Sequence, residues 1–423
     1  MTTDLRHVLD FVRRLLRNHP ESELRRRLAA KRQSSGLRFP TAYRVSPENL
    51  DRCWHALERF SVHRELLADA QTVSQLKSYV RSIENFIGTV KVPVGIAGPL
   101  RVNGLFAQGD YLVPLATTEA ALVASYHRGA QLITEAGGCT AMLLNEGLSR
   151  SPAFVFHGLV ESGQFVVWAT SQVGVFKELA ERTTRHGSLI DMRVAVEGNH
   201  VYLIFEYTTG DASGQNMATL ATDAIYDYIT QHSPVKPVYS CLEGNMSGDK
   251  KASFESYLMV RGRKVSAEVR APPELVRRRL HTTPQQMVAH WSVSAMGGVQ
   301  SGTVGVEAHY ANALAALYIA CGQDAACVAE SAVGVTRFQV DSQGNLYAAV
   351  TMPNIMVGTV GGGTHLPSQR LCLEILGLVG PGRAAAFAEV CAALCLAGEL
   401  SIAGALCAGR FCRAHRVLGR ARK

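Results

Sequence analysis

The chain has 423 residues, of which 47% are apolar and 18% charged. This composition excludes wholesale disorder, and the length exceeds what one core usually organises, so we expect two or three domains. The net charge of +8 is concentrated at the ends, because residues 1–40 hold ten Arg and Lys against four Asp and Glu, and residues 410–423 hold six against none. The remainder is acidic and carries no basic motif interleaved with aromatic residues, so we expect no nucleic-acid partner.

The ten cysteines are scattered without a CxxC pair, and no apolar segment with a cleavage site opens the sequence. These features predict a cytoplasmic protein with free thiols and no bound metal. The longest apolar tract, Val390–Ala408, could span a bilayer by length but carries Glu399 at its middle. A carboxylate there costs several kcal/mol in lipid, so we predict a buried helix and no membrane partner.

Residues 1–79 place apolar side chains three and four positions apart, with prolines as breaks, which predicts a helical N-terminal domain. Residues 90–104 are rich in Val, Pro and Gly and favour short strands and turns. The stretch 115–138 opens with two threonines and ends in Gly-Gly. We therefore expect a capped helix with Glu119 in its first turn, where the helix dipole stabilises a carboxylate.

Residues 152–241 alternate patterns in the order strand, helix, strand, strand, helix, strand. A strand at 153–161 is followed by a strand end and helix at 164–187, a hairpin at 191–210, a helix at 215–232 and a strand at 235–243. This order predicts a ferredoxin-like unit of about ninety residues. Beyond it we expect a strand at 252–260, helices around 283–293 and across 306–322, a strand at 346–354, a glycine loop at 357–364 and helices from Pro367 onward. The predicted fold class is α+β.

The stretch GNMSGDKKAS contains Asp249, Lys250 and Lys251 in succession. Neighbouring side chains of an extended segment point to opposite sides, so one lysine could enter a site while the other points away. An inward lysine beside an aspartate would stay charged and could face a developing oxyanion. A solvated loop remains the simpler interpretation of the local sequence.

Three further patterns have both a structural and a functional interpretation. The turn TTGDASGQN and the loop VGTVGGGT permit positive φ and close approach of a ligand, but neither matches a phosphate-binding signature, and each could be an ordinary turn. Asp324 lies among small apolar residues, where a carboxyl group is paired or has a raised pKa. His415 has several arginines around it, which would lower its pKa, although a lone histidine near a chain end is more often a surface residue.

Read in order, six blocks of the sequence resemble the catalytic domain of 3-hydroxy-3-methylglutaryl-CoA (HMG-CoA) reductase, from about residue 80 to the end. They are ENFIGTVKVPVGIAGPL, ATTEAALVAS, GNMSGDKKAS, AHYANALAALYIACGQDAA, LYAAVTMPNIMVGTVGGGTHLPSQ and LAGELSIAGALCAG. The two glycine-rich blocks look most like the NADPH-using class I. The resemblance implies a four-electron reduction of HMG-CoA to mevalonate and CoA, the step that feeds isoprenoid synthesis, by a homodimer or homotetramer with shared active sites.

The resemblance also implies a domain plan and catalytic roles. Residues 80–151 and 242–405 would form the substrate domain, 152–241 an inserted NADP-binding domain and 406–423 a flap. Lys250 would stabilise the oxyanion, Glu119 would protonate the reduced oxygen with a pKa raised by burial, Asp324 would lie between these two, and His415 would protonate the CoA thiolate. The residues that would bind the substrate are Arg150, Asp249, Lys251 and Asn312.

The cofactor roles fall on two loops and two arginines. Arg185 resembles the contact to the 2′-phosphate that selects NADPH, and Arg420 would reach the pyrophosphate. The other implied cofactor contacts are Asp211, Gly214, Gln215, Asn216, Gly358, Thr359, Gly361 and Gly362.

The chain departs from the family pattern at several of these positions. The family turn usually reads DAMGMN, whereas DASGQN puts Ser213 and Gln215 where methionines are usual, and Glu243 replaces a substrate-binding serine. The segment 289–300 lacks the lysine expected to help bind substrate. Two alternatives therefore stay open, namely NAD-dependent oxidation of mevalonate and a non-redox relative that binds an acyl-CoA.

Overall fold

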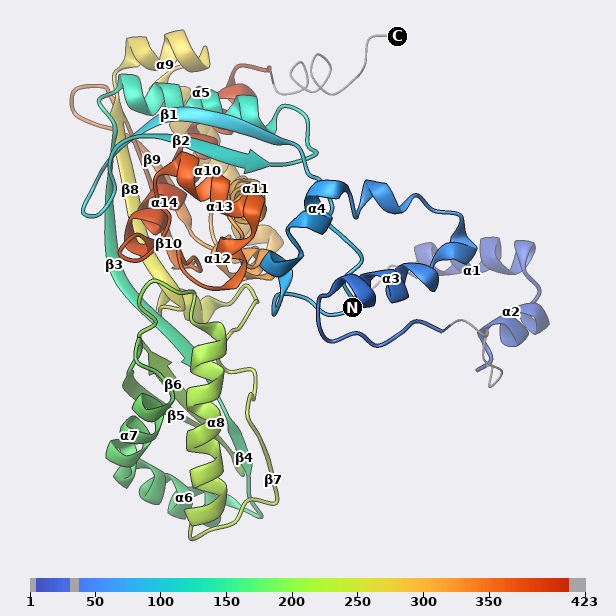
Figure 1. Ribbon diagram of the computed structural model, residues 1–423. Helices are drawn as coiled ribbons and strands as arrows, with labels where there is room; N and C mark the ends of the chain where they lie inside the picture. Colours follow the sequence, from blue (N-terminus) through green and yellow to red (C-terminus); the bar gives the residue numbers. More distant parts are fainter. Residues whose placement is uncertain (1–4, 31–37, 411–423) are drawn as a thin grey trace. The chain divides into compact units, whose positions relative to one another are not determined.

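The computed structural model describes residues 5–30 and 38–410. The chain divides into two compact units, residues 1–89 and 90–423. The first unit contains the helices α1 (Leu5–Asn18), α2 (Glu21–Leu28), α3 (Pro47–His55) and α4 (Ala70–Ser74), with short 3₁₀ turns between and after the last two (Figure 1). Ser46 caps α3 by accepting a hydrogen bond from the Asn49 amide, and Pro47 fills the first turn, where no donor is needed.

The second unit is built on long antiparallel strands. The strands β3 (Cys139–Arg150), β8 (Gly262–Ala271), β10 (Leu346–Ile355) and β9 (Val335–Val340) lie side by side in that order. The hairpin of β1 (Val94–Gly104) and β2 (Gln108–Ala116) joins the sheet through a parallel contact between β1 and β3. Along β1 and β8, buried residues alternate with more exposed ones and face the core, as expected of strands with one packed side.

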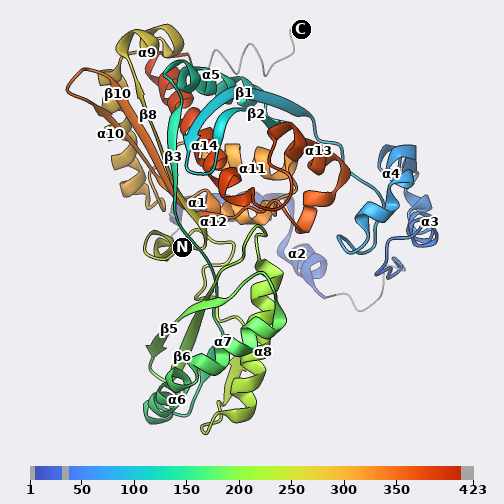
Figure 2. The ribbon, with the colours of Figure 1, turned by 60° about the vertical axis from the view of Figure 1, so that its left-hand side comes forward.

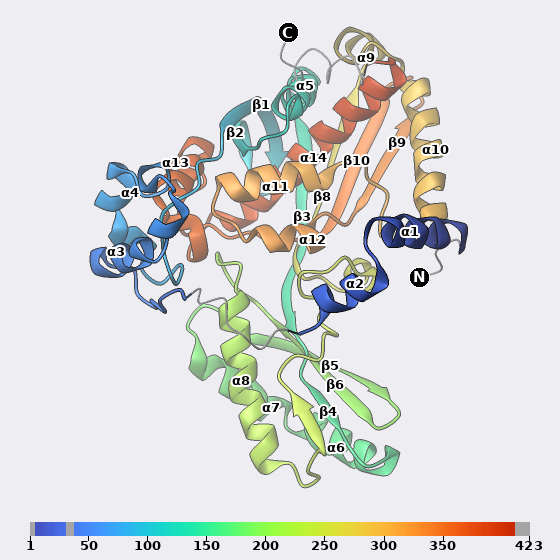
Figure 3. The ribbon, with the colours of Figure 1, turned by 90° about the vertical axis from the view of Figure 1, so that its right-hand side faces the viewer.

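Helix α14 (Ala384–Cys407) is the centre of this core. In Figures 2 and 3 it lies between the β1–β2 hairpin and the long strands β8 and β10, and it also contacts α5 (Leu122–Glu135) and α11 (Tyr310–Ala320). Within the described residues it is the one helix long and apolar enough to cross a membrane. Of its most apolar stretch of 18 residues, 83% is buried inside the protein. The predicted buried helix is thus confirmed. The remaining helices of the domain are α9 (Pro273–Leu280), α10 (Pro284–Ser301), α12 (Val328–Ser331) and α13 (Pro367–Leu376).

Residues 153–241 form a smaller domain with its own sheet. Its elements follow the chain as β4 (Ala153–Val155), α6 (Leu159–Ser171), α7 (Val173–Thr183), β5 (Leu189–Glu197), β6 (His200–Tyr207), α8 (Gln215–His232) and β7 (Tyr239–Cys241). The strands lie in the order β7, β4, β6, β5, with every neighbouring pair antiparallel, and α6, α7 and α8 cover one face (Figure 1). This is the predicted ferredoxin-like order. The end of β3, Leu148–Arg150, pairs with β6 and so continues the large sheet into the small one.

Several local predictions were wrong. Residues 164–171 belong to α6 and not to a strand, because Phe165 and Ala169, four positions apart, are buried on one helix face while Val167 is exposed. Residues 254–257 form a single 3₁₀ turn capped by Ser253, and the strand β8 begins only at Gly262. Helix α5 begins at Leu122, so Glu119 lies in the turn before it and not in its first turn.

Candidate active site

Lys250 lies in the loop between β7 and β8 and forms an ion pair with Asp324. Its backbone has a φ of +56°, a conformation that costs a non-glycine residue energy and is often found at functional sites. The Nζ atom lies 2.8 Å from Oδ2 of Asp324, and the two side chains are 41% and 42% exposed. The hydrogen bond that Lys250 donates to Asp324 raises the pKa of Lys250. Burial raises the pKa of Asp324, but the hydrogen bond and charge of Lys250 outweigh it, so this pKa is lowered and both groups are charged at neutral pH.

The two neighbouring lysines separate as expected, although the loop is a turn and not a strand. Lys251 is exposed and donates from Nζ to the backbone oxygen of Asp249 at 2.7 Å. The carboxylate of Asp249 points the other way, toward two arginines that are almost completely buried. It accepts from Arg261 at 2.6 Å and lies 3.0 Å from Nη1 of Arg150.

Arg150, at the end of β3, is oriented by side chains of the small domain. It donates from Nε to Thr219 at 3.1 Å and from Nη2 to Gln215 at 2.8 Å, both on α8. Its Nη1 atom is buried and has no aligned hydrogen-bond acceptor among the described residues, although Asp249 and Glu243 lie 3.0 and 3.9 Å away. A guanidinium held on one side with a donor left over can bind a further carboxylate.

Arg261 was not predicted as a site residue. It is 4% exposed, forms an ion pair with fully buried Glu330, and also donates to Asp249 and Gln215. Burial raises the pKa of Glu330, while the adjacent Arg261 opposes the increase. The sequence contains only a weak signal for Arg261, because it directly precedes β8 and its partners lie 12 to 69 positions away along the chain.

Glu119 and Asn312 form a second polar pair. The amide of Asn312, near the start of α11, donates to Oε2 of Glu119 at 2.7 Å. Glu119 is exposed, whereas we expected a buried acid. Asp324 pairs with Lys250, and its predicted place between Lys250 and Glu119 stays a prediction.

The two glycine-rich segments meet and line one groove of about 480 Å³. Its walls come from residues 212–217, residues 319 and 322–324, and the loop 358–364 with residues 366 and 369. A Cβ atom at Gly358 would lie 2.6 Å from the backbone nitrogen of Ser213, so only glycine allows the two segments to approach this closely. Asp324 therefore belongs both to the groove and to the Lys250 ion pair.

Arg263 joins the two glycine-rich segments and was also missed. It is 3% exposed and donates to the backbone oxygens of Val357 and Gly210, one in each segment. The Asp211 carboxylate accepts from the amides of Gly382 and Ala384, so it holds the turn against the start of α14. Five other predicted cofactor contacts line the groove, namely Gly214, Gln215, Asn216, Gly361 and Gly362.

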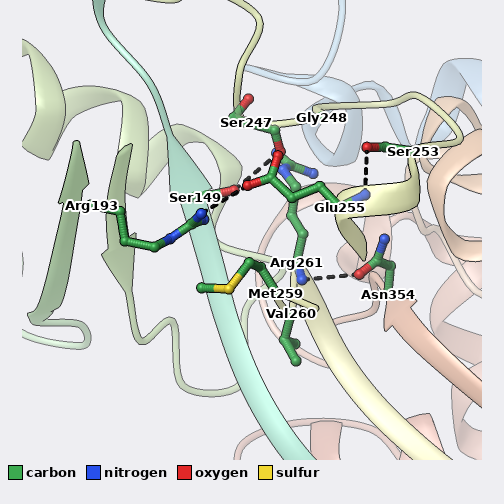
Figure 4. Close-up of a pocket in the computed structure, with 10 residues that line it drawn as sticks. All are labelled: Ser149, Arg193, Ser247, Gly248, Ser253, Glu255, Met259, Val260, Arg261 and Asn354. Carbon is green, nitrogen blue, oxygen red and sulfur yellow. Dashed lines mark hydrogen bonds and ion pairs between the residues drawn. The ribbon is translucent and has the colours of Figure 1, made fainter. Parts of the chain in front are cut away.

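A small cavity separates the Lys250 loop from the ferredoxin-like domain (Figure 4). Its volume of about 20 Å³ is enough for one water molecule. Figure 4 shows Arg193 reaching from β5 toward Glu255, with an Nη1 to Oε1 distance of 2.8 Å, while Asn354 on β10 accepts from the Arg261 amide. The loop that carries Lys250 is thus attached to the small domain at one end.

Two predicted positions lie outside the described residues, and one described position, Arg185, does not line the groove. Arg185 is exposed between α7 and β5. His415 and Arg420 lie outside the described residues, as does most of the predicted flap 406–423. Thr359 is buried and donates from its hydroxyl to the backbone oxygen of Gly380, which fixes the glycine loop and leaves its side chain turned inward.

Comparisons with known proteins agree with this arrangement. The family model described as hydroxymethylglutaryl-coenzyme A reductase matches residues 51–420. The 3-hydroxy-3-methylglutaryl-coenzyme A reductase of Methanothermobacter thermautotrophicus is 41% identical over 382 residues, which cover 90% of this chain and 94% of that protein. The enzyme of the same name from Haloferax volcanii is 43% identical over 345 residues, covering 80% and 85%.

Among solved structures, the class II 3-hydroxy-3-methylglutaryl-CoA reductase from Streptococcus pneumoniae bound to NADPH is similar with a TM-score of 0.63. The two chains are 20% identical, and the match covers 86% of this chain and 93% of that one, which shows a shared fold. The family model and the relatives extend over most of the sequence, including every described element of the site. The chain therefore belongs to the hydroxymethylglutaryl-coenzyme A reductase family.

Proposed function

We propose that this chain reduces HMG-CoA to mevalonate and CoA with two NADPH, in the cytoplasm. The observation that carries the proposal is the position of Asp324, which lines the groove between the two glycine-rich segments and holds the Lys250 ammonium group at its edge. A cation that stays charged beside a groove lined by two glycine-rich segments suits a reaction in which negative charge develops on a carbonyl oxygen next to the cofactor.

The reaction needs two carbonyl reductions in succession. In the first, the thioester carbon of HMG-CoA gains a hydride to give a hemithioacetal, which releases CoA as its thiolate and leaves an aldehyde. In the second, the aldehyde carbon gains a hydride and its oxygen a proton, giving the alcohol of mevalonate. Two NADPH and two protons are consumed for each mevalonate and CoA formed, so electrons and atoms balance.

NADPH, when bound, supplies the hydride for each step. The residues of this chain fit such a group, because Gly358 lets two backbone segments approach and Arg263 donates to both, with a groove of about 480 Å³ between them. The segments 212–217 and 358–364 would hold the dinucleotide, with the start of α8 directed at its phosphates. Arg185 would contact the 2′-phosphate that distinguishes NADPH from NADH.

Lys250 would stabilise each oxyanion as it forms, and Asp324 keeps it protonated and aimed. This assignment follows from the ion-pair distance of 2.8 Å and from the raised pKa of the lysine. Glu119 would deliver a proton to the reduced oxygen, held in place by the amide of Asn312. His415 would protonate the departing thiolate.

The carboxylate at the far end of the substrate would bind Arg150, whose Nη1 atom has a donor to spare. Lys251 is exposed nearby and would add charge. Because Glu119 and Asn312 make no contact with Lys250 and Asp324 within the described part of one chain, we propose that a second copy completes the site in a homodimer or homotetramer. Sedimentation of the purified protein tests this, and an active monomer would refute it.

The test of the activity is an assay of the purified protein with HMG-CoA and either NADPH or NADH. We expect loss of the reduced-nicotinamide absorbance that depends on HMG-CoA, is faster with NADPH, and is accompanied by release of a free thiol. A folded protein that binds HMG-CoA yet oxidises neither cofactor would instead support a non-redox role. A preference for NADH together with oxidation of mevalonate would support the reverse reaction.

A further inference from the structure

We propose that Gln215 is a positioning residue that couples occupation of the nucleotide groove to binding of the substrate carboxylate. The inference rests on the proposed function, since it assigns the groove to NADPH and Arg150 to the substrate. It goes beyond that function by naming one side chain through which the two sites influence each other.

The amide oxygen of Gln215 accepts hydrogen bonds from both buried arginines. Arg150 donates from Nη2 at 2.8 Å and Arg261 from Nη2 at 3.0 Å. The orientation of the amide is unambiguous, because guanidinium groups only donate and therefore select the oxygen end. Without this acceptor, each of two nearly buried cations would lose one of the partners that fix its plane.

The amide nitrogen of Gln215 extends the network toward Glu330. It donates to Sγ of Cys327 at 3.7 Å. Burial raises the pKa of this thiol, so it stays protonated and can donate to Glu330, the buried partner of Arg261. Gln215 thus contacts both buried arginines and, through one thiol, the carboxylate that pairs with Arg261.

Gln215 also forms part of the groove itself. It is the first residue of α8, directly after Gly214 at a φ of +76°, and it lines the groove with the other residues of that turn. A ligand that fixes the turn fixes the backbone from which the amide reaches the arginines. The second ligand then meets a site already ordered and loses less conformational entropy on binding, which makes the two affinities mutually dependent.

The residue usual at this position in the family cannot form this network. Methionine has a thioether that accepts weakly and donates nothing, so it can fill the space but cannot hold two guanidinium groups and a thiol. The coupling through Gln215 is therefore a property that we assign to this chain from its own contacts.

Calorimetric titration of NADP⁺ and HMG-CoA, which bind together without turnover, tests the proposal. The quantity measured is the factor by which saturating NADP⁺ changes the Kd of HMG-CoA. In the intact protein we expect tightening by about tenfold, within the usual range for coupled sites. In Gln215→Met we expect this factor to fall below about two, with a KM for HMG-CoA that rises far more than kcat falls. Gln164→Met makes the same change at an exposed position of α6, outside the groove, and should leave the factor unchanged.

Gln215→Glu keeps an acceptor for both arginines and should retain most of the coupling. This variant therefore distinguishes loss of the acceptor from a general loss of folding in Gln215→Met. The inference is overturned if the intact protein binds both ligands independently, or if Gln215→Met keeps the intact factor, or if Gln215→Glu loses it as Gln215→Met does. Failure of the intact protein to bind NADP⁺ at all would overturn the proposed function as well, so the two failures are distinguishable.

Discussion

Helix α14 and the loop at Lys250 both contain carboxylate or ammonium groups, but the two regions differ in how completely these groups are hydrogen-bonded by the protein. On α14, Glu389 is 0% and Glu399 3% exposed, and every carboxylate oxygen is saturated by the molecule itself. Glu389 accepts from the amides of residues 105, 106, 107 and 143, and Glu399 from Ala308, His309 and the Thr336 hydroxyl. These acids hold loops onto the core helix.

Lys250 and Asp324 form one ion pair, Asp324 also accepts from the Ala326 amide, and both side chains remain about two-fifths exposed beside a groove. Their remaining hydrogen-bonding capacity is available to a ligand. The contrast indicates that a saturated buried charge contributes to folding, whereas an incompletely paired charge at a groove is available for chemistry. Substitutions in the two regions should accordingly separate stability from activity.

The largest expected effect is that of Lys250→Ala on turnover. Removal of a preorganised cation from a developing oxyanion should lower kcat by about 10³-fold, while the exposed position should leave folding nearly unchanged. Steady-state kinetics and thermal unfolding of the same preparation check both parts. A variant with normal kcat would exclude Lys250 as the oxyanion-stabilising group.

Glu399→Ala should show the opposite pattern. It would leave two backbone amides and the Thr336 hydroxyl without their acceptor in a buried site, costing about 3 kcal/mol of unfolding free energy. Glu399→Gln keeps one acceptor oxygen, so its free energy of unfolding should fall by less. Denaturant unfolding monitors both variants, and equal stability of Glu399→Ala and the intact protein would contradict the structural role.

Arg263→Lys tests whether the groove depends on the contact between its two walls. A lysine cannot donate to both Val357 and Gly210 in the planar geometry of a guanidinium, so the affinity for NADPH should fall about tenfold. Arg337→Lys, on the exposed side of β9, serves as the matched control. If both variants bind NADPH as the intact protein does, Arg263 does not hold the groove.

The smallest effect concerns Glu307, which is partly buried near Glu399 and has one oxygen without a hydrogen bond among the described residues. Burial, and then the charge of Glu399, raise its pKa from 4.5 to about 7. An acid with a raised folded-state pKa stabilises the fold when protonated, and this stability is lost as the pH rises from its unfolded value toward about 7.

Glu307→Gln should therefore be more stable than the intact protein above neutral pH, by about 1 kcal/mol after allowance for solvent screening. Below the unfolded-state pKa the two proteins should differ little. Unfolding midpoints across this range measure the difference, and parallel pH profiles for the two proteins would exclude a titration of Glu307.

The sequence predicted those elements whose pattern is local and repeated. The helix Gln215–His232, the hairpin around Gly198 and the buried helix with Glu399 follow from periodicity and turn residues alone. The stretch 164–171 was assigned in part to a strand because Phe, Val and Trp favour strands, yet tertiary packing made it a helix.

The site was predicted only in part. Lys250, Asp324 and Arg150 follow from motifs that resemble a family, but Arg261 and Arg263 act through partners 12 to 94 positions away, which no local pattern records. The burial expected for Glu119 and the link between it and Asp324 are likewise tertiary properties. They depend on how separate segments, and in our proposal separate copies, come together.

The most direct test of the proposed reaction is its stoichiometry. Limiting HMG-CoA would be converted to completion with excess NADPH, and the mevalonate, free CoA and NADP⁺ formed would be counted in the same sample. A ratio of two NADP⁺ to one mevalonate and one CoA is the predicted result. One NADP⁺ for each CoA, with an aldehyde as the end product, or no cofactor oxidation, would contradict a four-electron reduction at this site.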